Sequence, residues 1–565
     1  MRLAWLLAFF FFAAAVPAVK AQNEIAQRSF FSLPFSNGYS SAVYDVNEKA
    51  LVAFTDMIEW YERPSRERKS FIRRVYPGLR YKEKTVWLCD VEPKSIGYLN
   101  ESGIVHVAYD LEGNRTDCYY FAPFTAGKHT IAIVCNTDAD EVLLHAELLS
   151  PEVKITKSTK GNSTMILLSI EPVKDISLEK EKKFWEDFHS IEPKVDPRYE
   201  KLFRQSTTFL KMGQSAESGA ILAGLLPGRW TICWVRDCCY SIKALVDSNH
   251  FTEAKKGLEF LLNGKAGEFE HFYYNGKDYG VGEDYLISAC RYFGDGTEWS
   301  DDIDQQEPEP IEGMKDPNIE LDGFGLFLWA ANEYVKKSED YKFLSENINK
   351  FESVGQNILH SIDHMNLIKA DSSIWERHLS RANHYIYTSI TCAEGLRGLS
   401  QMCEKSGADG SAYTKGYAQL KSGINACTDS KGALMGNLEE KEYHDAAVVE
   451  AINFGLVNES VAKNTMNALE RELFNGKGFK RNDDGDWYDE QEWVFIDLRA
   501  AESYLRLGEP EGATELLDRV KAISEENFNI IAELYDKDDN CAGQVPMCGY
   551  GAGVFVSTSA LLKNS

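Results

Sequence analysis

The feature that most constrains this chain is a long succession of helical patterns in its second part. About twelve segments between residues 197 and 563 repeat apolar side chains at the three- and four-residue spacing of an amphipathic helix. They are residues 199–212, 232–248, 252–262, 323–337, 341–364, 387–404, 412–426, 444–454, 460–473, 495–507, 512–523 and 552–562. Each helix must bury one apolar face, and no tandem sequence repeat is visible. The pattern therefore predicts helix pairs over one continuous core, as an α-solenoid or a closed double ring.

The links between these helices favour the closed ring. Five of them are long and rich in aromatic and acidic residues, unlike inert connections: 264–284, 294–322, 371–384, 476–491 and 527–550. Long loops gathered at one end of a scaffold are where functional sites are usually built. We therefore expect the site on these links.

The first part of the chain has a different pattern. Short β-branched or aromatic runs recur at 85–88, 104–109, 118–121, 130–134, 142–148 and 165–170, separated by Gly, Asn and Asp clusters. Such spacing is typical of an antiparallel β-sandwich, expected over residues 22–175. A charged helical linker with two prolines follows over 176–196. The helical domain then takes residues 197–565.

The first residues resemble a secretory signal. Arg2 precedes an apolar run at residues 3–15, and a small-residue cleavage site at 19–21 would leave Gln22 as the mature start. We therefore predict a signal peptide over residues 1–21 and a secreted protein. The apolar run is too short for a lasting membrane span.

Export agrees with two further features. The twelve cysteines are an even number, which predicts disulfide bonds among some of them, with one among Cys89, Cys118 and Cys135. Glycosylation sequons stand at Asn100, Asn114, Asn162 and Asn458, as in a secreted glycoprotein. No pair of CxxC motifs suggests structural zinc, and we expect no metal and no cofactor.

The net charge limits the kinds of partner that the protein is expected to bind. A formal charge of −26 argues against nucleic acid and against an anionic membrane surface. It suits a neutral substrate better than a polyanion. Abundant Trp and Tyr offer stacking surfaces for sugar rings, so a carbohydrate is the expected partner.

One stretch combines a carboxyl group with a large apolar ring. Glu376 directly follows Trp375 in a short break between two helical patterns. A carboxyl beside such a ring is poorly solvated, which raises its pKa and suits a general acid. The alternative is that Trp375 belongs to the core and Glu376 begins a helix.

Three other clusters lie on the links. Arg236 and Asp237 follow Trp234 and could donate to and accept from sugar hydroxyls, or form a buried ion pair. Asp322 opens an amphipathic helix, where it could be a plain N-cap. Glu533 precedes a Gly-rich segment that leads into a helix, where it could belong to a site. The alternative is that it is a surface residue beside a turn. Two carboxyls from separate loops suffice for glycoside hydrolysis.

These clusters, in this order, resemble glycoside hydrolase family 15, the glucoamylase family. The matching pieces are Trp234-Val235-Arg236-Asp237, Leu321-Asp322-Gly323-Phe324-Gly325, Ile374-Trp375-Glu376 and Ala532-Glu533-Leu534-Tyr535-Asp536. The resemblance implies an (α/α)6 barrel after a β-sandwich and an inverting, exo-acting α-glucosidase.

The resemblance also implies roles for single residues. Glu376 would be the general acid and Glu533 the general base. The terminal sugar would be bound by Arg236, Asp237, Trp234, Trp375, Arg377 and Asp322. The chain departs from the fungal glucoamylases, because the stretch Ser373-Ile374-Trp375-Glu376-Arg377-His378 lacks their second Glu. A short gluco-oligosaccharide, an isomaltose-like disaccharide, trehalose or another glycoside is therefore open as substrate.

Two other functions stay open. A polysaccharide lyase on the same scaffold would use a Tyr or His base and a cationic site for a uronate, and Arg377, His378, Arg381 and His384 allow it. A non-catalytic carbohydrate-binding protein would use the same aromatic residues without chemistry.

Overall fold

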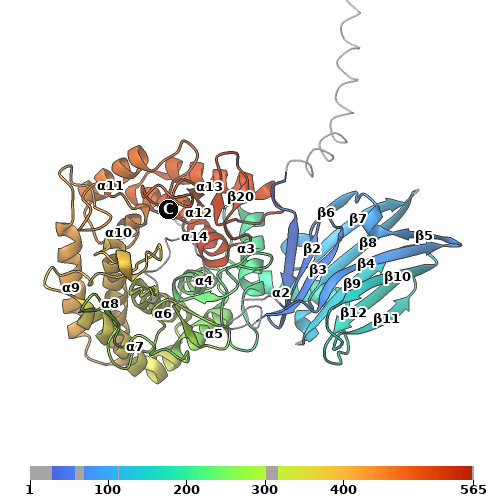
Figure 1. Ribbon diagram of the computed structural model, residues 1–565, viewed down its shortest axis with the longest axis horizontal. Coiled ribbons are helices and arrows are strands. Elements are labelled where there is room, and N and C mark those ends of the chain that lie inside the picture. The colour runs from blue at the N-terminus through green and yellow to red at the C-terminus, as the bar shows by residue number, and fades with distance from the viewer. Residues whose placement is uncertain (1–27, 58–68, 112, 127, 301–315, 563–565) are drawn as a thin grey trace, which may run out of the picture.

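The computed structural model has two parts that lie side by side, a β-sandwich and a ring of helices (Figure 1). It describes residues 28–57, 69–111, 113–126, 128–300 and 316–562. The predicted signal peptide, residues 1–21, lies outside these ranges. Among the residues described, no helix combines the length and the apolar character needed to cross a bilayer.

The N-terminal part consists of two antiparallel sheets, as predicted. One has the order β1 (Ser32–Ser36), β2 (Ser40–Asp45), β3 (Ala50–Asp56), β4 (Ile72–Tyr81), β10 (Glu141–Leu148), with β5 (Lys84–Trp87) also on β4. The other has the order β11 (Lys154–Lys160), β12 (Ser163–Ser169), β9 (Thr130–Asn136), β8 (Asn114–Phe121), β7 (Val105–Leu111), β6 (Ser95–Tyr98). Inward side chains of both sheets share one core, in which the rings of Tyr44 and Tyr120 lie 4.8 Å apart.

The helical part alternates between an inner and an outer layer. The inner helices are α4 (Val235–Asp247), α6 (Asp322–Ser338), α8 (Ile386–Ser406), α10 (Glu450–Asn453), α12 (Val494–Leu507) and α14 (Val554–Leu562). The outer helices are α3 (Glu200–Met212), α5 (Phe251–Leu262), α7 (Tyr341–Ser361), α9 (Ser411–Ala426), α11 (Glu459–Glu472) and α13 (Pro510–Glu525). Each inner helix contacts the next, and α14 contacts α4. The layer is therefore closed, which favours the double ring over an open solenoid.

Helix α2 (Leu178–His189) joins the two parts. Its N-cap Ser177 accepts a hydrogen bond from the backbone N–H of Lys180, which satisfies one free donor at the start of the helix. Phe184 stacks on Phe124 at the edge of the sandwich at 4.7 Å, and Trp185 is buried. Aromatic packing therefore fixes α2 against the sandwich.

The inner helices α6 and α8 approach closely through two glycines. A Cβ on Gly325 would lie 2.3 Å from the backbone of Thr391, and one on Gly395 would lie 2.5 Å from the carbonyl oxygen of Gly325. Neither distance is possible for real atoms, so even a methyl group would separate the helices.

We predict that Gly325→Ala destabilises the protein by about 1–3 kcal/mol, because overpacking forces the two backbones apart. Urea denaturation followed by circular dichroism measures it. Gly97→Ala is the control, since a Cβ there meets nothing within 4 Å. Equal stability of the two variants would contradict the close contact.

Candidate active site

The links that enter the inner helices meet around one cavity of about 150 Å³. Successive inner helices are all entered from the same end of the ring, so the links before them collect there. The cavity is lined by Ala223, Trp230, Trp234, Arg236, Asp237, Asn318, Ile374, Trp375, Glu376, His378, Arg481, Asp486, Tyr488, Trp493, Glu533, Met547 and Tyr550. Glu376 and Glu533, predicted from separate links, are both in this wall.

Glu376 lies on a strained link between α7 and α8. The φ angles of Ser373, Glu376 and His378 are 51°, 52° and 55°, in the left-handed region that non-glycine residues avoid. Such backbone strain persists only where surrounding contacts hold it, and it clusters at functional sites. Thr388 donates to the Ser373 hydroxyl at 2.9 Å, and the His378 N–H donates to the Asn318 carbonyl oxygen at 3.0 Å.

The Glu376 carboxylate is held by polar donors rather than by an apolar ring. It accepts hydrogen bonds from Trp234 Nε1 at 2.7 Å, an Arg291 guanidinium nitrogen at 2.9 Å and Asn318 Nδ2 at 3.1 Å. Trp375 instead turns its indole N–H to Asp445 Oδ1 at 3.0 Å. The predicted reason for choosing Glu376, desolvation by its Trp neighbour, is therefore wrong, although the residue lines the cavity.

Glu533 is the more deeply buried of the two carboxyls. Its Oε2 accepts from the Gln544 N–H at 2.7 Å and from Trp230 Nε1 at 3.3 Å. Oε1 accepts no hydrogen bond from any part of the chain that the structure describes. Burial raises the pKa of Glu533 to about 7, against the lowering effect of the Gln544 and Trp230 hydrogen bonds. A Cβ on Gly543 would lie 2.3 Å from Glu533 Oε2, so this position needs glycine.

Two tryptophans fix both carboxyls with respect to each other. Trp230 donates to Glu533 and Trp234 donates to Glu376. Their rings lie 5.6 Å apart at 76°, in edge-to-face contact. The two carboxyls therefore belong to one connected unit around the same hollow.

Asp237 presents a free acceptor beside them. Its Oδ1 is buried without a hydrogen-bond partner. Burial raises the pKa of Asp237 to about 7, and the charges of Glu533 and Glu376 add to the effect while Arg236 opposes it. A buried acceptor without a donor is costly in the empty cavity and suits a ligand hydroxyl.

Arg236 lines the cavity and is anchored from behind. It donates to the Glu320 carboxylate, lies 3.4 Å from Asp322 Oδ2 and 3.6 Å from Glu376 Oε1. The predicted buried ion pair is thus present, but with Glu320 and Asp322 as the partners.

Two predicted sugar-binding residues do not line the cavity. Asp322 is fully buried in the first turn of α6, where its carboxylate faces Arg236, so it positions that side chain. The Arg377 guanidinium turns to Asp484 at 2.8 Å. Both side chains find charged partners behind the wall, which takes them away from the cavity.

One group within the described ranges has the spacing of metal ligands. Atoms of Cys290, Glu320 and Glu376 lie within 4.8 Å of one another. Guanidinium groups already occupy this position, because Arg291 contacts Cys290 Sγ at 3.1 Å and Glu376 at 2.9 Å, while Arg236 pairs with Glu320. The donor set is therefore neutralised by side chains and does not fit a cation.

Several lining residues were not predicted. Arg481, Tyr488 and Trp493 come from the link before α12, whose aromatic and acidic composition was the available signal. The Arg481 guanidinium lies 5.4 Å from the Trp375 ring and 5.1 Å from the Trp493 ring, as in cation–π contacts. Arg291 is fully buried and follows no motif, so nothing in the sequence marked it.

Comparison with known proteins agrees with this architecture. The structure matches the crystal structure of a bacterial glucoamylase complexed with acarbose, with a TM-score of 0.65 and 11% identity over 94% of both chains. A wild-type glycosidase matches with a TM-score of 0.51 and 16% identity, over 65% of this chain and 100% of that one. The chain has a glucoamylase-like fold.

Sequence comparison adds one relative. Trehalase 2 of Sulfolobus acidocaldarius is 23% identical over 324 residues, which is 54% of this chain and about half (52%) of the trehalase. No protein-family model matches the sequence. By their names, this relative and the structural neighbours are glycoside hydrolases.

The raised pKa of Glu533 predicts a pH dependence. If Glu533 acts as a base, only its ionised form works. We expect kcat/KM to fall about tenfold per unit as the pH drops below about 7. A pH profile of kcat/KM measures it. Trp230→Phe removes a hydrogen-bond donor to the ionised form of Glu533. The pH below which kcat/KM falls should therefore rise by about one unit.

An activity that falls above pH 7 instead would show that Glu533 donates the proton and would exchange the two roles. Lys342→Met on the exposed face of α7 is the control and should leave the pH dependence unchanged.

Proposed function

We propose that this protein is an exo-acting, inverting glycoside hydrolase that removes a terminal non-reducing sugar, α-linked glucose, from a short oligosaccharide or glycoside. The helical ring would be an (α/α)6 barrel. The observation that carries the proposal is the connected unit in which Trp230 and Trp234 hold Glu533 and Glu376 at one cavity.

The chemistry needs two carboxyls on opposite faces of the sugar. Glu376 would give its proton to the departing glycosidic oxygen. Glu533, through its free Oε1, would take a proton from a water that attacks the anomeric carbon from the other face. Carboxyls about 6.5–9.5 Å apart leave room for this water, and the product anomer is inverted.

The cavity walls suit one neutral sugar ring. Asp237 Oδ1 would accept a sugar hydroxyl and Arg236 would donate to another. Tyr550 also lines the cavity, and its ring stacks on Phe495 at 4.0 Å. If Tyr550 closes the inner end of the cavity, a chain end would bind rather than a chain that threads through, which is an exo mode.

Charge disfavours the lyase. The wall carries four carboxyl groups and two guanidinium groups, those of Asp237, Glu376, Asp486 and Glu533 and those of Arg236 and Arg481. The excess of carboxylates would repel the carboxylate of a uronate. Of the residues that kept this option open, only His378 is in the wall, and His384 binds Asp363 and Glu439 elsewhere.

The similarity to known proteins supports an α-linked glucoside as the substrate. A trehalase and an acarbose-bound glucoamylase are among the matches. Both names point to α-linked glucosides, and the small cavity suits disaccharides such as trehalose and short gluco-oligosaccharides.

We predict that Glu376→Gln and Glu533→Gln each lower kcat by about 10² to 10⁴, because each removes one proton-transfer group. Glu346→Gln, on the exposed outer face of α7, is the matched control and should keep full activity. A panel of α-linked disaccharides followed by proton NMR gives both the rate and the first product anomer.

The β-anomer of glucose is expected first. Retention of the α-anomer, or full activity of both active-site variants, would overturn the proposal. An unsaturated, ultraviolet-absorbing product would favour the lyase.

We also propose that the protein is exported and that Cys118 and Cys135 form a disulfide outside the cell. The two residues face each other on β8 and β9, and their sulfur atoms lie 3.0 Å apart as free thiols. Mass spectrometry of secreted protein, alkylated without reduction, should find Gln22 at the N-terminus and this pair unalkylated. Alkylation of both thiols would contradict the disulfide.

A further inference from the structure

A second cavity of about 610 Å³ lies at the other end of the helical ring, toward the C-terminal ends of the inner helices. Its wall includes side chains from α4, α6, α8, α12 and α14. This volume is within the range of about 300–1,000 Å³ that small-molecule sites occupy. None of the residues in this wall lines the catalytic cavity.

Aromatic side chains separate the two cavities. Tyr240 lines the second cavity and Tyr550 lines the catalytic one, with ring centroids 5.7 Å apart. The Tyr240 hydroxyl donates to Glu450 Oε1 at 2.7 Å and lies 3.4 Å from the Tyr387 hydroxyl. The second cavity is therefore a site of its own rather than a continuation of the first.

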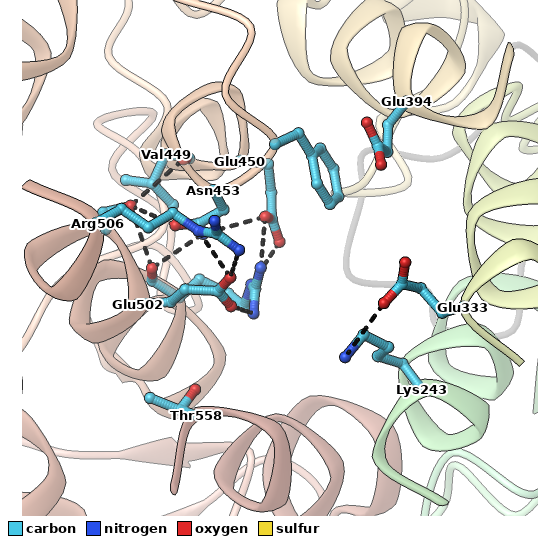
Figure 2. A network of polar contacts seen from close by, with 12 residues as sticks. Lys243, Glu333, Glu394, Val449, Glu450, Asn453, Glu502, Arg506 and Thr558 are labelled. Carbon is cyan, nitrogen blue, oxygen red and sulfur yellow. Dashed lines mark hydrogen bonds and ion pairs between the residues drawn. The ribbon is translucent and has the colours of Figure 1, made fainter. Parts of the chain in front are cut away.

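One side of the cavity is a saturated ionic network (Figure 2). Arg499 donates to Glu450 at 2.5 and 2.7 Å and also to Glu502. Arg506 donates twice to Glu502, at 3.0 and 2.5 Å. Asn453 donates to Glu450 at 3.1 Å. A fully bonded buried network is rigid, so this side is a preformed wall.

The facing side has unused hydrogen-bonding capacity. Figure 2 shows Glu394, Glu333 and Lys243 on helices across the opening from this network. Glu333 Oε1 accepts a hydrogen bond from Lys336, whereas for Oε2 the ion pair found among the described residues is with Lys243, at 3.9 Å. Glu394 is buried, and its Oε1 accepts a hydrogen bond from Arg397 at 2.7 Å. The same guanidinium nitrogen lies 2.6 Å from Oε2, but Oε2 accepts no hydrogen bond of good geometry.

Lys243 provides donors beside these acceptors. Its ammonium group contacts both carboxylate oxygens of Asp247, at 2.6 and 2.7 Å. An ammonium has three N–H donors, so one is left for a ligand.

Two aromatic rings complete the cavity. Trp329 and Phe454 both line it, with centroids 5.4 Å apart at 63°. In the described part of the chain, the Trp329 indole N–H makes no hydrogen bond. A flat apolar face with a free polar edge suits a ligand that has both C–H and O–H groups.

Most charges of the wall are paired with one another. Lys243 contacts Asp247, Lys336 contacts Glu333, Arg397 contacts Glu394, and both Arg499 and Arg506 contact Glu502. Lys194 and Lys337 give the wall an excess of cations, but an ionic ligand of either sign would compete with these pairs. A neutral molecule with many hydroxyls can donate to the carboxylates and accept from the ammonium group.

We propose that this second cavity binds a small neutral polyol of mono- or disaccharide size. Glu333, Glu394 and Lys243 hydrogen-bond its hydroxyls, and Trp329 packs on its ring. The site is independent of the hydrolytic chemistry proposed for the first cavity.

Saturation-transfer NMR with D-glucose as the probe tests the site. The measurement is made in an Asp237→Asn background, which weakens sugar binding in the catalytic cavity. We expect the glucose signal to persist in this background and in Asp237→Asn/Glu346→Gln, the matched control. Adding Glu394→Gln or Trp329→Phe should lower it about fivefold or more, because each removes a direct contact.

The variants are compared only where their unfolding midpoints match, and Glu394→Gln carries the test if Trp329→Phe unfolds. Loss of the signal in Asp237→Asn alone, or no effect of Glu394→Gln, would overturn the proposal. Displacement of glucose by millimolar phosphate or calcium would overturn the neutral class of ligand. A failure to hydrolyse glycosides would not affect the result, since it measures binding alone.

Discussion

The cavity between the links gathers carboxyl groups where water is scarce, and two buried arginines compensate their charge. Arg236 and Arg291 are 3% and 0% exposed, and between them they contact Glu320, Asp322 and Glu376. Burial raises the pKa of Glu320 to about 8 even beside Arg236, which shows how poorly solvated this group is. Removing one partner of such a set typically costs 3–5 kcal/mol. The charge balance therefore holds the whole wall together.

The ring of helices explains why these groups can meet. Residues 236, 376 and 533 are far apart along the chain, but the first lies in the first turn of α4 and the other two on links, and all three line the same cavity. Trp230 and Trp234 then bring two of the carboxyls into one unit by edge-to-face contact. The opposite ends of the same helices surround a second polar cavity, so one scaffold offers two separate hollows.

Local signals predicted the elements well. The pattern at 199–212 became α3 (Glu200–Met212), and the pattern at 495–507 became α12 (Val494–Leu507). The pattern at 444–454 is instead a 3-10 turn followed by the single-turn helix α10. No separate run was predicted for β1, β2, β3, β4, β6 or β11, although the first five lie within the predicted sandwich and carry buried side chains or pair with strands that do. Strand β11 has only exposed side chains, and an edge strand without a buried face lacks apolar alternation.

The site was predictable only in part. Glu376, Glu533, Arg236 and Asp237 stand in short motifs and do line the cavity. The direction of the Asp322 side chain could not be predicted from the sequence, because it is set by Arg236 on another helix. Arg291 acts on Glu376 across 85 residues of sequence, a contact that only the folded chain creates.

In the proposed mechanism, the carboxyls of Glu376 and Glu533 face each other across one sugar. A crystal structure of the Glu376→Gln variant with an uncleaved α-linked disaccharide measures this directly. We expect the glycosidic oxygen within hydrogen-bond reach of residue 376, and a water on Glu533 Oε1 at the opposite face of the anomeric carbon. A sugar bound elsewhere, or both side chains on the same face, would contradict it.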